Sequence, residues 1–230
     1  MEDNLITFPK SNTDDWLVTG MVRKHQGTLI SGLSDSFKSF TALDIAMSVA
    51  TGKSFTARTS KTRKRACALL LVPTLQKDRT FRRIEAWGKK HGSPNDEPNI
   101  YVIPCDIKAD IDDHIDELIS LYETSVADLI VTPHLSHFIS SFDEPTQRRW
   151  ISNMQRLAKK NSAAFLSTHQ ISSNTDGFLQ TIRKPYHIEY FATKTGDLSA
   201  TLVPMKTKYG CTKILHQTFV RSMTSLAPTK

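Results

Sequence analysis

Apolar and polar positions are arranged along the chain in blocks that predict alternating strands and helices. A short apolar run predicts a buried strand, whereas apolar residues three and four positions apart predict a helix with one buried face. The expected strands cover residues 28–31, 66–72, 99–103, 127–131 and 163–168. The expected helices cover residues 40–51, 80–91, 110–123 and 146–161. This α/β order predicts βαβ units and a mostly parallel, twisted sheet flanked by helices.

The pattern changes after about residue 185. Two apolar blocks, residues 188–193 and 198–206, are separated by a Thr-Gly-Asp turn, and this arrangement predicts an antiparallel hairpin. Residues 216–221 predict one more strand. We therefore expect a C-terminal antiparallel β extension beside the parallel core.

The chain of 230 residues is long enough for one large buried core. Residues 1–13 are polar and are expected to form a flexible lead. Residues 14–222 are expected to form a single domain, and residues 223–230 a flexible tail.

Composition indicates a cytoplasmic protein. Hydrophobic residues make up 39% of the chain and charged residues 23%, as in soluble globular proteins. The acidic start does not resemble a signal peptide, and no apolar run is long enough to cross a membrane. Cys67, Cys105 and Cys211 form no Cys-x-x-Cys pair, so we expect reduced thiols.

The chain is basic, with a net charge of +7 and a pI of about 9.3. This balance is compatible with DNA as a partner, but it is also common in proteins that bind no nucleic acid. Residues 58–65 hold five basic side chains and no acidic one. A solvated loop before a strand explains that cluster more simply than a binding surface does.

The strongest chemical signal is the loop from Gly32 to Ser39, which follows a predicted strand and opens a predicted helix. Backbone N–H groups at a helix N-terminus lack partners, and the helix dipole adds positive potential, so phosphate groups bind there. Lys38 would contact the outer phosphates, and the Ser39 hydroxyl would be a ligand of Mg²⁺. The candidate nucleotide-binding residues are Gly32, Ser34, Asp35, Ser36, Phe37, Lys38, Ser39 and Phe40.

Phe37 departs from the usual pattern GxxxxGK[ST], which has glycine before the lysine. We expect this residue to have the helical backbone conformation, which does not demand glycine. The alternative for residues 32–39 is an ordinary Ser-rich turn that caps a helix.

Several blocks of the chain resemble the RepA-like AAA ATPases of plasmids and phages, which are RecA-fold relatives of hexameric replicative helicases. The matching blocks are residues 15–18, 27–30, 37–40, 42–46, 48–52, 82–87, 128–131 and 168–170. An aromatic residue before the loop lysine is a familiar variant in that group. The resemblance covers residues from about 14 to 208 and implies a RecA-like P-loop core, ATP and Mg²⁺ as ligands, and self-association into a ring, for which a hexamer is one option.

The chain departs from that family at both catalytic carboxylates. Thr132 and Pro133 stand where the family has its Walker B aspartate, and residues 73–76 read Pro-Thr-Leu-Gln where it has a Gly-Glu pair. Metal placement and water activation both need a carboxylate, so their loss predicts weak or absent hydrolysis.

Other matching positions suggest roles that the residue types alone do not decide. His169 matches the family's sensor histidine, but a histidine at the edge of the core with a backbone partner is an equal alternative. Lys206 and Lys208 match a basic pair that reaches into the neighbouring subunit's nucleotide, but they also fit solvated charges at a strand end. Residues 171–185 replace a Gly- and Arg-rich stretch near the family's DNA loops, which argues against translocation along a strand.

Metal-binding and covalent chemistry find no support in the sequence. His134 and His137 lie three positions apart after a predicted strand, but no Cys/His cluster with zinc spacing accompanies them. No nucleophile elbow is present either.

Two main functions remain open from the sequence, and a weaker third is a protein that binds only DNA and has lost its nucleotide site. The first is an ATP-binding RecA-like protein that acts in DNA replication, or a related DNA transaction, of a plasmid, phage or mobile element. The second is a non-enzymatic nucleotide sensor or scaffold that oligomerises through the RecA fold.

Overall fold

The computed structural model describes residues 15–53, 66–91, 98–108, 110–121, 127–141, 143–171, 186, 188–197, 199–207 and 215–218. The expected lead (1–13) and tail (223–230) lie outside these residues, as do the basic cluster 58–65, Lys208, Cys211 and nearly all of 171–185. The expected limits of the domain therefore stay predictions.

The described residues form ten strands and four α-helices in the order expected of a parallel α/β core. The strands are β1 (Trp16–Val18), β2 (Val22–Arg23), β3 (Gly27–Gly32), β4 (Ala68–Val72), β5 (Ile100–Pro104), β6 (Leu129–Thr132), β7 (Ala164–Gln170), β8 (Ile188–Gly196), β9 (Ser199–Thr207) and β10 (Leu215–Thr218). The helices are α1 (Lys38–Thr51), α2 (Lys77–His91), α3 (Asp112–Leu121) and α4 (Glu144–Lys160), with 3-10 turns η2 (Thr74–Gln76) and η3 (Leu135–His137).

The main sheet of the described residues has eight strands in the order β10-β9-β8-β3-β7-β6-β4-β5. β3 lies between β7 and β8 and is parallel to both, with Ser31 opposite His169 on one side and Phe191 on the other. β8, β9 and β10 pair antiparallel. The predicted parallel core with a C-terminal antiparallel extension is therefore confirmed.

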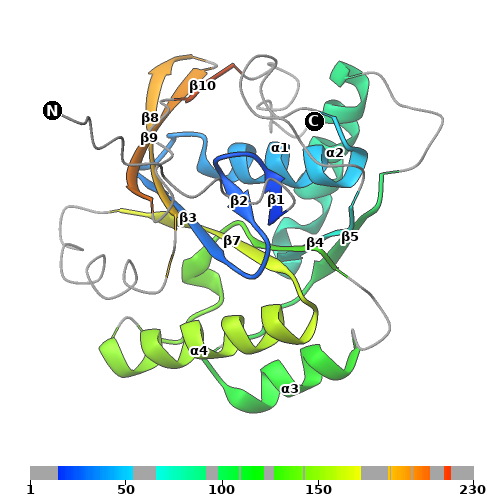
Figure 1. The fold of residues 1–230 in the computed structure, drawn as a ribbon, viewed down its shortest axis with the longest axis vertical. Helices are drawn as coiled ribbons and strands as arrows, with labels where there is room; N and C mark the ends of the chain where they lie inside the picture. The colour runs from blue at the N-terminus through cyan, green and yellow to red at the C-terminus, as the bar shows by residue number, and fades with distance from the viewer. Residues whose placement is uncertain are drawn as a thin grey trace, which may run out of the picture.

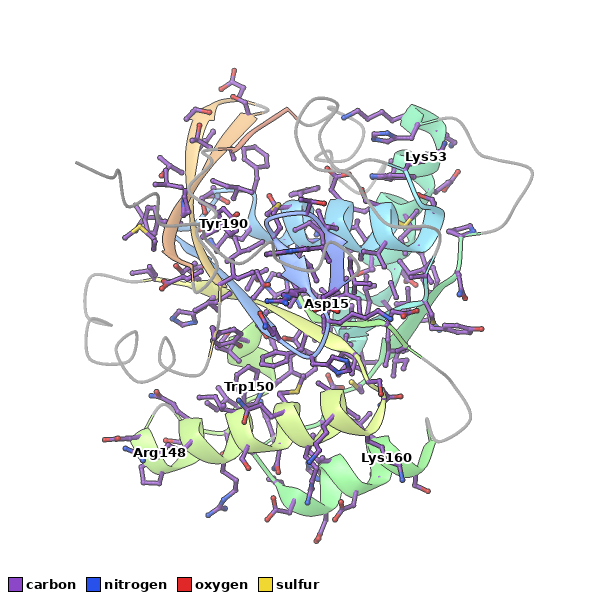
Figure 2. All side chains as sticks on the ribbon, viewed as in Figure 1. Asp15, Lys53, Arg148, Trp150, Lys160 and Tyr190 are labelled. Carbon is purple, nitrogen blue, oxygen red and sulfur yellow. The ribbon has the colours of Figure 1, made fainter. Side chains whose placement is uncertain are left out.

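Helices cover both faces of this sheet (Figure 1). α1 and α2 pack with the β1–β2 hairpin over one face, and their shared core includes Ile45 and Trp87. α3 and α4 cover the opposite face around Trp150, which is fully buried. Figure 2 shows Trp150 on the side of α4 that faces the sheet. Burying apolar surface on both faces is the main stabilising contribution in such a layered fold.

The β1–β2 hairpin was not predicted as strands, because its strands of three and two residues are too short to show a periodic pattern. Tertiary contacts hold it in place instead. The Tyr190 hydroxyl on β8 donates to the Gly20 carbonyl at 2.8 Å, and the Thr28 hydroxyl on β3 donates to the Met21 carbonyl at 2.7 Å. Arg23 also forms an ion pair with Asp15.

Within the part of the chain that the structure describes, no helix is both long enough and apolar enough to cross a membrane.

Candidate functional site

The loop from Gly32 to Ser39 joins the end of β3 to the start of α1, as predicted. β3 lies in the middle of the sheet, and its carboxyl end meets the carboxyl ends of β7, β6 and β4 at one edge. A side chain at Gly32 would not fit, because its Cβ would lie 2.4 Å from the Ala192 carbonyl oxygen and 2.7 Å from the Ser36 hydroxyl. The strand therefore enters the loop through a position that only glycine fills without displacing β8.

Lys38 curls back over this loop. Its Nζ donates to the Leu33 carbonyl and, at 3.1 Å, to the Ser36 hydroxyl, which itself donates to the same carbonyl at 2.8 Å. Only 8% of Lys38 is exposed. Burial lowers the pKa of Lys38 to about 8, and the carboxylate of Asp35 opposes that shift. The ammonium group is thus held inside the loop, where an anion would meet it.

Phe37 contradicts the expectation of a helical backbone. It precedes α1 with φ 59° and ψ 17°, in the left-handed region that favours glycine. Its carbonyl already accepts the first bond of the helix, from Thr41 N at 2.9 Å, so the sharp turn from loop to helix falls on this residue. Its ring packs against Phe40, with centroids 5.9 Å apart. That contact offsets part of the conformational cost of the left-handed backbone, which is of the order of 1 kcal/mol.

The Ser39 hydroxyl faces the end of β6. It donates to the Pro133 carbonyl oxygen at 3.2 Å and lies 3.2 Å from His134 Nε2. The Thr168 hydroxyl at the end of β7 donates to the same Pro133 carbonyl. A backbone carbonyl and an imidazole therefore stand where the resemblance placed a carboxylate.

An open cavity of about 600 Å³ lies over the loop and the first turn of α1. Besides the loop residues 34–40, it is lined by Arg79, Arg83, His134, Leu135, Ser136, His137, Thr168, Gln170 and Lys194. Four of the lining side chains are cationic, namely Lys38, Arg79, Arg83 and Lys194. Asp35 is the one carboxylate among the described lining residues. The cavity therefore suits a polyanionic ligand.

Two of these cations come from α2, which follows β4. Arg79 and Arg83 are four residues apart and so lie on one side of the helix. Arg79 is exposed, whereas Arg83 is 9% exposed and its guanidinium carbon lies 4.0 Å from the centre of the Phe40 ring. Burial, and next the charge of Arg79, lower the pKa of Arg83 to about 10. Arg83 therefore stays protonated at neutral pH while lying against the first turn of α1.

Two histidines near the loop are held neutral. His169 is buried opposite Ser31, and burial followed by the charge of Lys38 lowers its pKa to about 4. The pKa of His134 is also lowered to about 4, chiefly by burial and then by the charges of His137 and Arg83. His169 lies close to the start of the loop, because it pairs with Ser31, the residue before Gly32.

The stretch after β4 carries no carboxylate toward the loop. Residues 74–76 form η2, in which Leu75 is 98% exposed. Gln76 instead lines a small second cavity together with Ser39, Arg83 and His134. None of the described residues lining that cavity is acidic.

The two lysines predicted to reach a neighbouring subunit's nucleotide, Lys206 and Lys208, are not among the described residues that line this cavity. The backbone of Lys206 lies on β9 opposite Glu189. The Lys206 side chain and all of Lys208 lie outside the described part of the chain.

Sequence reasoning missed Arg79, Arg83, His134 and Lys194 as lining residues. A usable signal existed for three of them, because Arg79, Arg83 and His134 shortly follow strands whose carboxyl ends share an edge with the loop. Lys194 had no such signal, since it comes from the antiparallel part of the sheet.

Comparison with known proteins agrees with this geometry. A family model described as an AAA domain matches residues 3–176, about three quarters of the chain. The chain belongs to the AAA domain family. No curated protein sequence matches this AAA domain.

A solved structure has a fold similar to that of this AAA domain. The flagellar accessory protein FlaH from Methanocaldococcus jannaschii aligns with it at a TM-score of 0.54 and 11% sequence identity, over 84% of each chain. At that identity the likeness concerns the fold alone. It supports the RecA-like P-loop architecture, and the family as a whole generally binds a nucleotide with Mg²⁺.

The residues of this AAA domain do not fit Mg²⁺ in the way expected of the family. Mg²⁺ takes oxygen ligands in an octahedral arrangement and is usually anchored by one or two carboxylates. The hydroxyl expected to bind it, that of Ser39, faces a neutral imidazole and a backbone carbonyl. Asp35, the one carboxylate among the described lining residues, is exposed on the loop.

Proposed function

We propose that this AAA domain binds ATP in the cavity over residues 32–39 and hydrolyses it weakly or not at all. The observation that supports binding is the convergence of Lys38, Arg79 and Arg83 on the N-terminus of α1. An N-terminus with free backbone N–H groups and nearby cations is a favourable site for phosphate groups.

In this proposal each part of the loop makes a different contact with the nucleotide. The backbone around Ser34–Phe37 cradles the phosphates, and Lys38 exchanges its bonds to the Leu33 carbonyl and Ser36 for the outer phosphates. The Ser39 hydroxyl, at the first turn of α1, is a further donor. His169 senses the outer phosphate, which is supported by its position opposite Ser31 and by the effect of Lys38 on its pKa.

The chemistry at the ends of β4 and β6 supports weak hydrolysis. A general base must lie within hydrogen-bond reach of the attacking water. In the described residues these ends offer Gln76, the Pro133 carbonyl and a neutral His134 whose Nε2 already faces the Ser39 hydroxyl. None of these groups is a carboxylate that holds a metal or takes a proton from water.

The resemblance to RepA-like proteins supports a role in DNA replication, or a related DNA transaction, of a plasmid, phage or mobile element. The net charge of +7 supports contact with DNA. Assembly into a ring would let Lys206 or Lys208 reach the nucleotide of a neighbouring subunit, as an arginine finger does.

A nucleotide sensor or scaffold is the second candidate. The lack of acidic side chains around Ser39, among the described residues, favours it, because a sensor needs binding but no turnover. In that case ATP would stabilise the fold or its assembly.

Ligand-linked stability tests the binding proposal. ATP with Mg²⁺, at about 100 times its Kd, should raise the melting temperature by roughly 5–10 °C, and Lys38→Ala should abolish the shift. Lys89→Ala is a matched control, because Lys89 is exposed and pairs with Glu85 on the far part of α2. Equal melting temperatures with and without ATP for the wild type would overturn the proposal.

Phosphate release separates a motor from a sensor. We expect the wild-type rate to stay close to background, and turnover well above background that Lys38→Ala removes would contradict weak hydrolysis. DNA affinity measured against salt concentration tests the DNA role, because phosphate contacts give a steep negative slope.

A further inference from the structure

Positive charge is concentrated at the point where a nucleotide-bound metal ion would lie. Arg83, Ser39 and His134 line both the large cavity over the loop and the small cavity behind it. The buried guanidinium group of Arg83 is therefore a neighbour of the hydroxyl that the family uses for Mg²⁺.

The side chain of Arg83 is buried and lines the cavity over the loop. It is 9% exposed, and its Nε makes no hydrogen bond to any described residue. Its guanidinium stacks on Phe40, which lies one residue after Ser39. A buried donor without a partner is costly, so this position favours an anionic acceptor.

The positive charges around Ser39 oppose the binding of a divalent metal ion there. Lys38, Arg79 and Arg83 line the same cavity as Ser39. A divalent ion beside Ser39 would be repelled by these cations. Carboxylates would normally compensate this repulsion, and the described residues around Ser39 supply none.

We propose that this pocket holds the triphosphate of ATP without a divalent cation, with the guanidinium groups of Arg83 and Arg79 supplying the charge that Mg²⁺ supplies in related proteins. This inference rests on the proposed nucleotide binding. Guanidinium groups suit the task because they stay charged and present several donors in a planar fork. A site of this kind holds the nucleotide without the metal that assists phosphoryl transfer, and it is consistent with weak hydrolysis.

Calorimetric titration of ATP into the full-length protein, once with Mg²⁺ and once with excess EDTA, tests the inference. We expect the two Kd values to agree within about threefold. Arg79→Ala should weaken binding in EDTA by about tenfold, the loss expected for one charge-assisted contact. Arg82→Ala is the control, because Arg82 is exposed on the same helix and does not line the cavity.

Arg83→Lys is the second variant, because it keeps a charge in the buried position while removing the planar fork. We expect it to weaken binding in EDTA while the melting temperature of the free protein stays close to that of the wild type. Arg79 is exposed, so Arg79→Ala keeps the test valid even if changes at Arg83 disturb the packing on Phe40.

The outcomes are distinct. Binding with Mg²⁺ that weakens at least about tenfold in EDTA would overturn the inference and leave the proposed function standing. Metal-independent binding that neither arginine variant changes would overturn the assignment to Arg79 and Arg83. The absence of ATP binding in both buffers would overturn the proposed function and the inference with it.

Discussion

The Ser39 hydroxyl and the Pro133 carbonyl oxygen are 3.2 Å apart, so the start of α1 is tied to the end of β6 by a hydrogen bond to the backbone. Thr168, at the end of β7, donates to the same carbonyl. Three elements of the site thus meet at one neutral acceptor. A carboxylate there would hold a metal ion, whereas a carbonyl mainly fixes the geometry of the loop.

The pKa of Lys38 predicts how nucleotide binding depends on pH. This pKa is lowered to about 8, with Asp35 opposing the shift, so the ammonium loses its proton as the pH rises through that value. Since the charged form binds phosphate, we expect the ATP affinity to fall between about pH 7 and 9. Titrations at several pH values measure this fall.

Lys38→Arg is the control for that experiment. Arginine stays protonated over the whole range, so the affinity of Lys38→Arg should change much less with pH. An identical fall in this variant would show that Lys38 does not cause the pH dependence.

Two histidines with lowered pKa values predict a loss of stability in acid. The pKa values of His134 and His169 are lowered from 6.5 to about 4, so the unfolded chain binds these protons at a higher pH than the folded chain does. The free energy of unfolding should therefore be highest above pH 6.5 and should fall as the pH drops from 6.5 to 4, by roughly 1–3 kcal/mol for each histidine.

Urea unfolding at several pH values measures that slope. Replacing His169 by Gln should make the slope shallower. His25→Asn is a suitable control, because His25 is exposed with φ 59°, a conformation that asparagine tolerates. An unchanged slope in His169→Gln would contradict the assignment.

A carboxylate introduced beside Ser39 should repel the nucleotide. Gln76 lines the small cavity with Ser39 and Arg83, so Gln76→Glu would place a negative charge near the phosphates and pair with the arginine. We expect ATP affinity in EDTA to fall by about tenfold, and the loss to be smaller with Mg²⁺. Calorimetric titration in the two buffers measures both values.

Leu75→Glu is the matched control for Gln76→Glu. Leu75 is the preceding residue, is 98% exposed and lines neither cavity beside Ser39. Its replacement should leave the affinity unchanged. If both variants lost the same affinity, the effect would come from net charge and not from position.

A buried carboxylate that does not line the cationic pocket stabilises the loop that follows η3. Asp110 is 4% exposed and accepts bonds from both the backbone N–H, at 2.9 Å, and the hydroxyl of Ser140. Asp110→Ala would remove two hydrogen bonds to a buried carboxylate, so it should reduce the free energy of unfolding by about 1–3 kcal/mol. Urea denaturation measures the loss, and an unchanged midpoint would contradict it.

Some of this protein could be predicted from its sequence because the determining interactions are local. The strand before Gly32, the helix after Lys38 and the hairpin of β8 and β9 follow from periodicity and turn residues, and the structure confirms them. The lack of carboxylates near Leu75 and at Pro133 could also be predicted, because catalytic groups of such folds are expected directly after the core strands.

Contacts between distant segments determined the backbone conformation and the surroundings of the loop residues. Phe37 adopts a left-handed backbone at the point where the loop turns into α1, and the residue type alone does not reveal this. The approach of Arg83 to Ser39 depends on how α2 packs against α1, and the contact of His134 with Ser39 depends on the pairing of β6 between β4 and β7. Sequence therefore determined the phosphate loop, whereas packing between distant segments determined the charges that surround it.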